Sequence, residues 1–404
     1  MKYKNNNFFI ESVKAEKIAK KYGTPSYCYS YSKLKNNILN FKQNFQNLDP
    51  LICFAVKSNP NLYLLKEIKK FGLGADVVSI GELMRAIKAG INPKKIVFSG
   101  VGKTEEEIKY AINKKILLIN TESESEVKNI EKISKTIRKK IDIGIRLNPN
   151  TDAKTLSQIS TGKKENKFGV DEKKFLHLVK YVKSSNNLNL RCLSVHIGSQ
   201  ILSHKPYEKM LKVLDRVIKK SNFQFDFIDL GGGMGIDYDG TNKRLNLKKY
   251  SIAIRKFTKK HKSKIIFEPG RSIIGNTGIM LAKVTYIKEN SSKDFIILDA
   301  AMNDLMRPAL YNAKHRILPL NKKNQKSKKR YEFVGPICES TDKFLDVNKF
   351  QKLNEKDFIA ICDTGAYGMS LSSNYNMRPK APEIFINGSK IKIITKRQKL
   401  KDLI

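Results

Sequence analysis

The sequence predicts an α/β protein that combines a (β/α)8 barrel with a second, mostly C-terminal all-β domain. Two observations predict this architecture. Between residues 50 and 270, short apolar runs rich in Val and Ile alternate with longer, Lys-rich amphipathic stretches. After Gly270 that alternation stops, and short apolar runs follow one another through polar turns. Eight strand–helix units favour a parallel sheet closed into a barrel, with an open doubly wound sheet as the alternative.

The eight expected strands are apolar runs bounded by loops. They cover residues 52–57, 75–79, 96–100, 117–120, 141–147, 192–198, 227–233 and 264–270. The expected helices between them include residues 62–71, 80–89, 103–114, 123–137, 207–220 and 247–261. Apolar residues recur there every three or four positions, as at Leu211, Leu214 and Ile218. Thr104 and Glu107 have the spacing of a capping box, which predicts a helix start.

The second domain is expected to be β-rich because its apolar runs are short and separated by turns. Residues 280–298 predict two strands around a polar turn. Further strands are expected at 26–31, 331–334, 358–362, 383–386 and 391–395. We therefore expect a barrel domain over residues 33–280. Residues 1–32 plus 281–404 would form a β-sandwich or Greek-key-like domain.

The formal net charge of +40 is one that proteins binding nucleic acids or membrane surfaces often have. Only 13 of the 78 basic residues are Arg, however, and the 65 Lys residues are spread along nearly every expected helix. Proteins that recognise nucleic-acid sequences favour Arg for bidentate contacts, and their basic residues cluster on one surface. We therefore interpret the charge as compositional and expect neither a nucleic-acid nor a membrane partner.

The five cysteines are odd in number and show no CxxC or Cys/His spacing. This predicts neither a disulfide framework nor a metal site, and it favours a reducing compartment. No apolar run is long enough to span a membrane, and residues 1–10 lack the apolar stretch of a secretory signal. A cytoplasmic location is expected.

Residues at the carboxyl ends of barrel strands face the active site in this architecture. Lys57 ends the first expected strand, where its amine is suited to attack a carbonyl or, equally, to reach out to solvent. His196 and Ser199 lie at the end of the sixth expected strand, where they are placed to contact a ligand ring and a phosphate. A satisfied strand-end histidine is the alternative for His196.

The seventh and eighth strand ends add two further features. Residues 231–233 are three consecutive glycines, which let a backbone approach an anion closely or simply form a tight turn. Glu268 is followed by Pro269, Gly270 and Arg271. The carboxylate is suited to a heterocyclic N–H and the guanidinium to a phosphate or carboxylate, or the two pair with each other. An amine, an imidazole, a phosphate cradle and a carboxylate at one barrel mouth match pyridoxal 5'-phosphate.

Ordered motifs along nearly the whole chain strengthen this interpretation. They are FAVKSNPN, GADVVSIGEL, SVHIGSQI, DLGGGMGIDY, FEPGRSI, MRPALYNAKH, VGPICESTD and CDTGAYGMSLSSNYNMRP. With them the chain resembles the fold type III, alanine-racemase-like pyridoxal-phosphate decarboxylases, and among these the enzymes that act on diaminopimelate. The resemblance implies decarboxylation of meso-2,6-diaminopimelate to L-lysine and CO2, the last step of lysine biosynthesis.

The resemblance also implies residue roles. Lys57 and Cys338 would be catalytic, with Lys57 bonded to the cofactor and Cys338 as the acid that returns a proton. The implied cofactor-binding residues are Lys57, His196, Ser199, Gly232, Glu268, Pro269, Gly270, Arg271 and Tyr367. The implied substrate-binding residues are Arg271, Arg307, Tyr311, Glu339 and Tyr367. In this family Cys338 and Glu339 reach the site from a second subunit, which implies a homodimer with shared active sites.

Three alternatives remain open from the sequence. The chain could be an ornithine- or arginine-type decarboxylase of the same fold, although the Arg and Tyr of MRPALYNAKH argue against it. It could be a racemase, which would need a second acid/base and release no CO2. It could be a non-catalytic homologue that binds pyridoxal phosphate.

Overall fold

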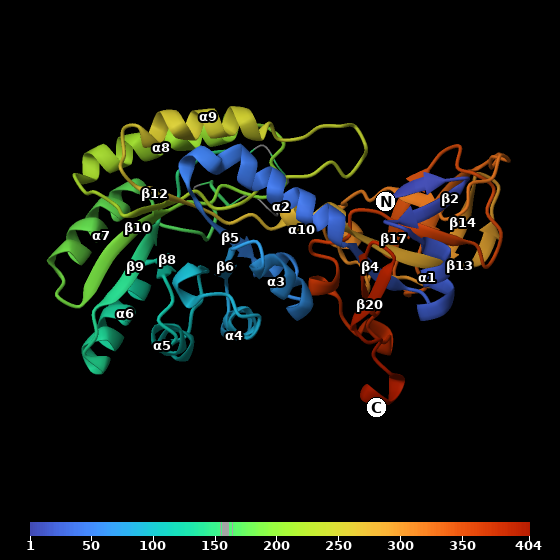
Figure 1. Ribbon diagram of the computed structural model, residues 1–404, viewed down its shortest axis with the longest axis horizontal. Helices are drawn as coiled ribbons and strands as arrows, with labels where there is room; N and C mark the ends of the chain where they lie inside the picture. The colour runs from blue at the N-terminus through green and yellow to red at the C-terminus, as the bar shows by residue number, and fades with distance from the viewer. Residues whose placement is uncertain (154, 156–160, 164) are drawn as a thin grey trace. The chain divides into compact units, whose positions relative to one another are not determined.

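The computed structural model describes residues 1–153, 155, 161–163 and 165–404, which form two compact units (Figure 1). The barrel unit comprises Ile38–Ile236 and Arg244–Ser272. The β unit comprises Met1–Asn37, Asp237–Lys243 and Ile273–Ile404. Within the described residues, no helix combines the length and the apolar content needed to cross a bilayer.

Eight parallel strands close the barrel unit into a ring. They are β5 (Leu51–Ala55), β6 (Gly74–Val77), β7 (Ile96–Phe98), β8 (Leu118–Thr121), β9 (Ile141–Arg146), β10 (Leu188–Ser194), β11 (Phe227–Asp229) and β12 (Lys264–Phe267). Pairing of β12 with β5, where Ile266 faces Leu51, joins the last strand to the first. The predicted barrel is therefore confirmed and the open sheet is excluded.

Helices cover the outside of this ring (Figure 1). They are α3 (Leu62–Lys69), α4 (Ile80–Lys88), α5 (Glu105–Asn113), α6 (Glu124–Ile137), α7 (Glu172–Ser184), α8 (Lys205–Ser221) and α9 (Leu247–Thr258). Thr104 and Glu107 form the capping box that was predicted at the start of α5. The apolar residues of α8, including Leu211, Leu214 and Ile218, are buried as their spacing predicts.

Helices α2 (Tyr31–Phe45) and α7 pack on the barrel and were not among the predicted helices. Helix α2 carries Phe41 and Phe45, whose rings lie 5.6 and 4.5 Å from the ring of Phe267 on β12. Helix α7 buries Phe175, Leu178, Val179 and Val182 and is capped by Asp171. Its apolar spacing is the same signal that identified the other helices.

Several strands end earlier than expected, because the chain leaves the ladder before the polar residues at the rim. Lys57 lies in a 3₁₀ turn, η2 (Val56–Ser58), and not at the last position of β5. His196 lies two residues beyond β10, and Glu268 follows directly after β12. The functional side chains therefore belong to the loops at the carboxyl edge of the sheet.

The β unit is organised around a sheet with the order β17-β16-β14-β13-β4-β19-β20. Its strands are β4 (Ser26–Ser30), β13 (Gly278–Glu289), β14 (Lys293–Leu298), β16 (Arg330–Val334), β17 (Lys343–Val347), β19 (Glu383–Asn387) and β20 (Lys390–Thr395). Strands β15 (Ile317–Pro319) and β18 (Phe358–Ile361) pair with each other, and β18 also pairs with β13. The predicted N-terminal strand is thus confirmed as β4, which lies between β13 and β19.

Parts of the β unit differ from the expectation. A small sheet of β1 (Lys2–Lys4), β2 (Asn7–Ile10) and β3 (Val13–Lys14) precedes α1 (Ala15–Tyr22), and none of these was predicted. Strands β14 and β16 are parallel, and the chain between them includes the short helix α11 (Arg307–Tyr311). Ile10, Ile18 and Cys28 of the N-terminal segment join Leu281 and Ile384 in one buried core.

Residues 237–243 were expected in the barrel domain, but they belong to the β unit. The physical reason is the side chain of Tyr238. Its ring lies 5.0 Å from the ring of His315, and the guanidinium carbon of Arg307 lies 4.4 Å from its centroid. This aromatic and cation–π packing ties the segment to the second unit.

Candidate active site

Lys57 is paired with a buried carboxylate at the mouth of the barrel. Its Nζ lies 2.8 Å from Oδ2 of Asp76, which is wholly buried at the end of β6, while 37% of the lysine side chain is exposed. A lysine that only reaches toward solvent needs no such partner. The amine is therefore held in place at the barrel mouth and remains accessible to a ligand.

Glu268 lies among other carboxyl groups. Ser99, just after β7, donates to its Oε1 at 3.3 Å. Burial raises the pKa of Glu268 well above its usual value, and the negative charges of Asp229 and Asp76 raise that pKa further. A carboxyl group with a raised pKa keeps its proton to a higher pH than usual and is suited to face a basic ring nitrogen.

His196 is held as a neutral imidazole. The backbone N–H of Gly232 donates to its Nδ1 at 3.1 Å. Burial lowers its pKa well below the usual value, and the positive charges of Arg146 and Lys57 lower it further. A neutral ring in this position is suited to pack against a flat ligand.

The glycine turn fits between two strand ends. A Cβ on Gly232 would lie 2.1 Å from the carbonyl oxygen of Glu268, so only glycine allows this approach. The N–H groups of Gly231 and Gly232 donate to Asp229 and His196. In this arrangement the turn therefore sets the positions of the carboxyl group and the imidazole, and its contact with a phosphate stays a prediction.

Arg271 and Ser199 come together as a potential anion site. The Nη2 of Arg271, at the start of α10 (Arg271–Ile274), donates to the Ser199 hydroxyl at 2.9 Å. The carbonyl of Pro269 accepts from the N–H of Ala55 at 3.2 Å, which ties this loop to the end of β5. Gly270 lies against Ser58, next to the lysine. A guanidinium and a hydroxyl group are donors that a phosphate accepts.

In the β unit, Arg307 is buried and firmly oriented. Its Nη1 donates to Nε2 of His315 at 2.6 Å, and Nδ1 of that imidazole donates to the carbonyl of Cys362 at 2.8 Å. Tyr311 lies one turn further along α11, on the same side of the helix as Arg307. Their shared role in binding a substrate, which the resemblance implies, stays a prediction.

The remaining predicted residues also belong to the β unit. Cys338 and Glu339 follow β16 and are exposed, and the hydroxyl groups of Tyr375 and Thr341 donate to Glu339. Tyr367 has a φ of +57°. A bulky residue rarely adopts this backbone region, and such strain concentrates at functional sites.

Several polar residues of the barrel mouth were missed by the sequence analysis. Asp76, Asn120, Arg146 and Asp229 occupy the last or penultimate positions of β6, β8, β9 and β11. Arg146 pairs with Glu122 at 2.8 Å. A polar residue at the end of an apolar run was the signal that could have identified them. The sequence analysis used this signal at four other strand ends only.

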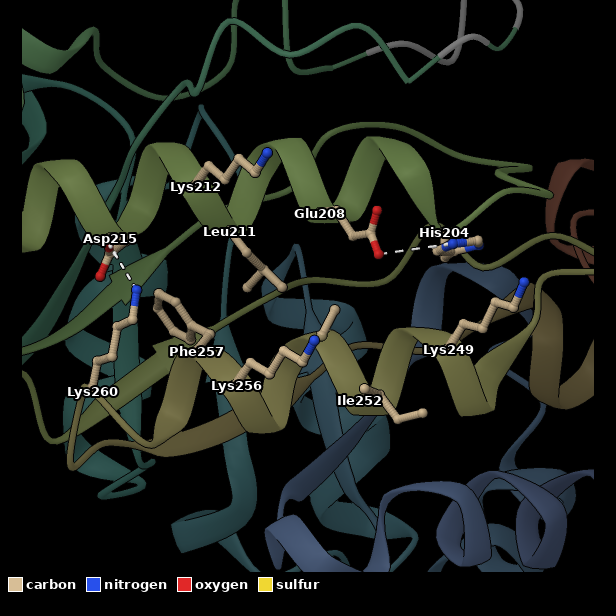
Figure 2. A pocket seen from close by; sticks show the side chains of 11 residues that line it. His204, Glu208, Leu211, Lys212, Asp215, Lys249, Ile252, Lys256, Phe257 and Lys260 are labelled. Carbon is tan, nitrogen blue, oxygen red and sulfur yellow. Dashed lines mark ion pairs between the residues drawn. The ribbon is translucent and has the colours of Figure 1, made fainter.

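A groove of about 630 Å³ lies elsewhere, on the outer surface between α8 and α9 (Figure 2). Leu211 and Phe257 form its buried base, and the exposed Lys249 and Lys256 line its rim. It shares no residue with the barrel mouth. We therefore assign the candidate active site to the strand ends and not to this groove.

The donor set at the barrel mouth fits pyridoxal phosphate. An accessible amine, a neutral imidazole, a buried carboxyl group with a raised pKa and a guanidinium paired with a hydroxyl group suit its aldehyde, ring face, ring nitrogen and phosphate.

Comparisons with known proteins agree with this chemistry. The family model of the pyridoxal-dependent decarboxylases, pyridoxal binding domain, matches residues 31–275. A diaminopimelate decarboxylase of Aquifex aeolicus is 40% identical over 98% of this chain and 95% of its own length. The crystal structure of the Helicobacter pylori diaminopimelate decarboxylase complexed with L-lysine superposes with a TM-score of 0.92. It is 42% identical and covers 96% of this chain and 98% of its own.

A diaminopimelate decarboxylase structure from M. jannaschii, also in complex with L-lysine, has a TM-score of 0.94 at 35% identity and covers 100% of this chain and 96% of its own. Identity of this extent over both units, together with the amine, imidazole and carboxyl groups at the strand ends, places the chain in the diaminopimelate decarboxylase family of pyridoxal-dependent decarboxylases.

Proposed function

We propose that this protein decarboxylates meso-2,6-diaminopimelate to L-lysine and CO2 with pyridoxal phosphate bound at the barrel mouth. The observation that carries the proposal is the pairing of Lys57 with Asp76 close to the buried carboxyl group of Glu268. The similarity to diaminopimelate decarboxylases along the whole chain supports the choice of substrate.

Pyridoxal phosphate supplies a ring that accepts the electron pair left when CO2 departs. Lys57 would hold it covalently, Arg271 and Ser199 would bind its phosphate, and His196 would pack against its ring. Glu268 would keep a proton at the ring nitrogen, which deepens the electron sink by an electrostatic effect of several kcal/mol. We propose Gly232, Pro269, Gly270 and Tyr367 as further contacts.

We propose that Arg307 and Tyr311, with Arg271, hold the distal carboxylate of the substrate. Arg307 is buried and its guanidinium is oriented by His315 and Tyr238, so little ordering is needed when a carboxylate binds. A substrate without that carboxylate could not use the hydrogen bonds that the oriented guanidinium offers, which costs discrimination factors on the order of 10⁴. This argues against ornithine as the substrate.

Cys338 and Glu339 are proposed to act in the site of a second subunit, as the proton donor to the α-carbon and the partner of the distal ammonium. Their exposure in the single chain supports this arrangement. The Tyr375 hydroxyl that donates to Glu339 would orient the carboxylate. The site would then be complete only in a homodimer. The five free cysteines support a reducing, cytoplasmic location.

Release of CO2 from meso-diaminopimelate by the purified protein tests the proposal, with L-ornithine and L-arginine as comparison substrates. Borohydride reduction and peptide mass analysis should place a pyridoxyl group on Lys57. A modified Lys57 without CO2 release would instead identify a non-catalytic homologue.

Mixing two inactive variants tests the shared site. Lys57→Ala and Cys338→Ala subunits, allowed to exchange, should recover about a quarter of wild-type activity, since half the dimers are mixed and each contains one intact site. No recovery between subunits that do exchange would contradict the proposed role of Cys338.

A further inference from the structure

Three carboxyl groups lie close together at the barrel mouth, and the ion pair with Lys57 balances the charge of one of them. Asp76 is matched by Lys57 at 2.8 Å. Asp229 and Glu268 remain and are both buried, and hydrogen bonds that run through Asn120 and Ser99 link the two carboxyl groups. Two like charges buried in one network are costly, so the pair holds one proton.

The hydrogen bonds decide which group carries that proton. Both oxygens of Asp229 accept from neutral donors, Oδ1 from the N–H of Gly231 at 2.9 Å and Oδ2 from Nδ2 of Asn120 at 3.0 Å. Glu268 accepts one longer hydrogen bond, from Ser99 at 3.3 Å. Donors directed at both oxygens favour the ionised form of Asp229. The proton therefore resides on Glu268.

Asn120 is itself held in one orientation. Its Nδ2 lies 3.4 Å from the Ser99 hydroxyl, so one amide group links both carboxyl groups. Its Oδ1 occupies space that a side chain on Gly144 of β9 would need, since a Cβ there would lie 2.1 Å from it. Residues of β8, β9 and β11 and of the turns after β7 and β12 thus come together around this pair.

We propose that Asp229 is a positioning residue whose fixed negative charge, oriented by Asn120, keeps the proton of Glu268 available to the cofactor ring nitrogen. In the proton balance, Glu268 would give up the proton that a bound ring nitrogen gains, and Asp229 would stay ionised. The charge of Asp229 would then also favour the proton on that nitrogen. This inference rests on the proposed function, because the ring belongs to the cofactor.

Other charged groups around Glu268 do not duplicate this role. Asp76 contributes negative charge, but Lys57 pairs with it. His196 is held neutral. The guanidinium of Arg271 donates to Ser199. Asp229 is therefore the carboxylate whose charge acts most directly on Glu268. Among the neighbouring charges, it contributes most to the raised pKa of Glu268.

Nitrogen-15 NMR of the holoenzyme loaded with ring-labelled pyridoxal phosphate tests the proposal directly, because the shift of the ring nitrogen reports its protonation. Asp229→Asn should lower the pH at which this nitrogen loses its proton by about one unit or more, a tenfold loss of proton affinity. Asp226→Asn is the matched control. It removes the same charge three residues earlier, where the carboxylate is exposed and paired with Arg191, and should change nothing.

An unchanged ring titration in Asp229→Asn would overturn the inference while leaving the proposed function intact, whereas failure to bind the cofactor in wild type would refute the function itself. If Asp229→Asn does not fold, Asn120→Ala decides. Without the amide donor Asp229 takes the shared proton more often, so the ring titration should move in the same direction by a smaller amount. No shift in Asn120→Ala would refute the proposal.

Discussion

The barrel mouth and the groove between α8 and α9 both contain lysines, but they use them differently. Lys57 is joined to a wholly buried carboxylate, within a cluster in which Glu268 and His196 have shifted pKa values. In the groove, Lys249 and Lys256 extend from exposed helix faces over an apolar base (Figure 2). A wholly buried carboxylate partner at the barrel mouth, and not positive charge itself, distinguishes Lys57 from the lysines of the groove.

The largest expected effect is that of Lys57→Ala. Loss of the covalent anchor should abolish the absorbance band of the bound cofactor and lower kcat/KM by more than about 10³-fold. Lys66→Ala, an exposed lysine on α3, is the matched control and should keep both. If Lys57→Ala kept the wild-type absorbance spectrum of the bound cofactor, Lys57 would not differ in function from the exposed lysines.

Arg307→Ala should lower kcat/KM for meso-diaminopimelate by about 10²- to 10⁴-fold, because the distal carboxylate loses its buried partner. The cofactor spectrum should be unchanged. Arg307→Lys should recover only part of the loss, since a lysine cannot reproduce the packing of the guanidinium on Tyr238. Near-normal activity in Arg307→Ala would place substrate recognition elsewhere.

Glu268→Gln should change how stability depends on pH in the cofactor-free protein. The folded state raises the pKa of Glu268, so the unfolded chain loses this proton first, and wild-type stability falls as pH rises above 4.5, the ordinary pKa of a glutamate. The variant lacks this group and should gain stability relative to wild type, by up to about 1.4 kcal/mol per pH unit until the folded pKa is reached. Urea unfolding across a pH series measures the difference. Parallel curves would contradict the raised pKa.

The smallest effect is expected in the groove. Lys256→Gln should change stability by less than about 0.5 kcal/mol and leave kcat/KM unaltered, because the side chain is exposed on α9. Thermal unfolding and a CO2-release assay check this. A large loss of activity would show that the groove takes part in function after all.

The sequence was most informative where local pattern decides structure. Apolar runs identified the barrel strands, and Thr104 with Glu107 identified a helix start, because both signals act over a few residues. The sheet of β1, β2 and β3 was missed because its strands have two to four residues and depend on the core they cover. Asp229 was missed because its importance depends on Asn120 and Glu268, which come from other strands.

Strand β4 has a consequence for how the protein is made. It pairs with β13 on one side and with β19, near the end of the chain, on the other. Ribosomes add roughly 5–20 residues per second, so the edge of β4 that pairs with β19 stays unpaired for on the order of tens of seconds until β19 is synthesised. Exposed strand edges promote aggregation during such delays. Nascent chains of this protein should therefore depend on protection of β4 until β19 has been synthesised.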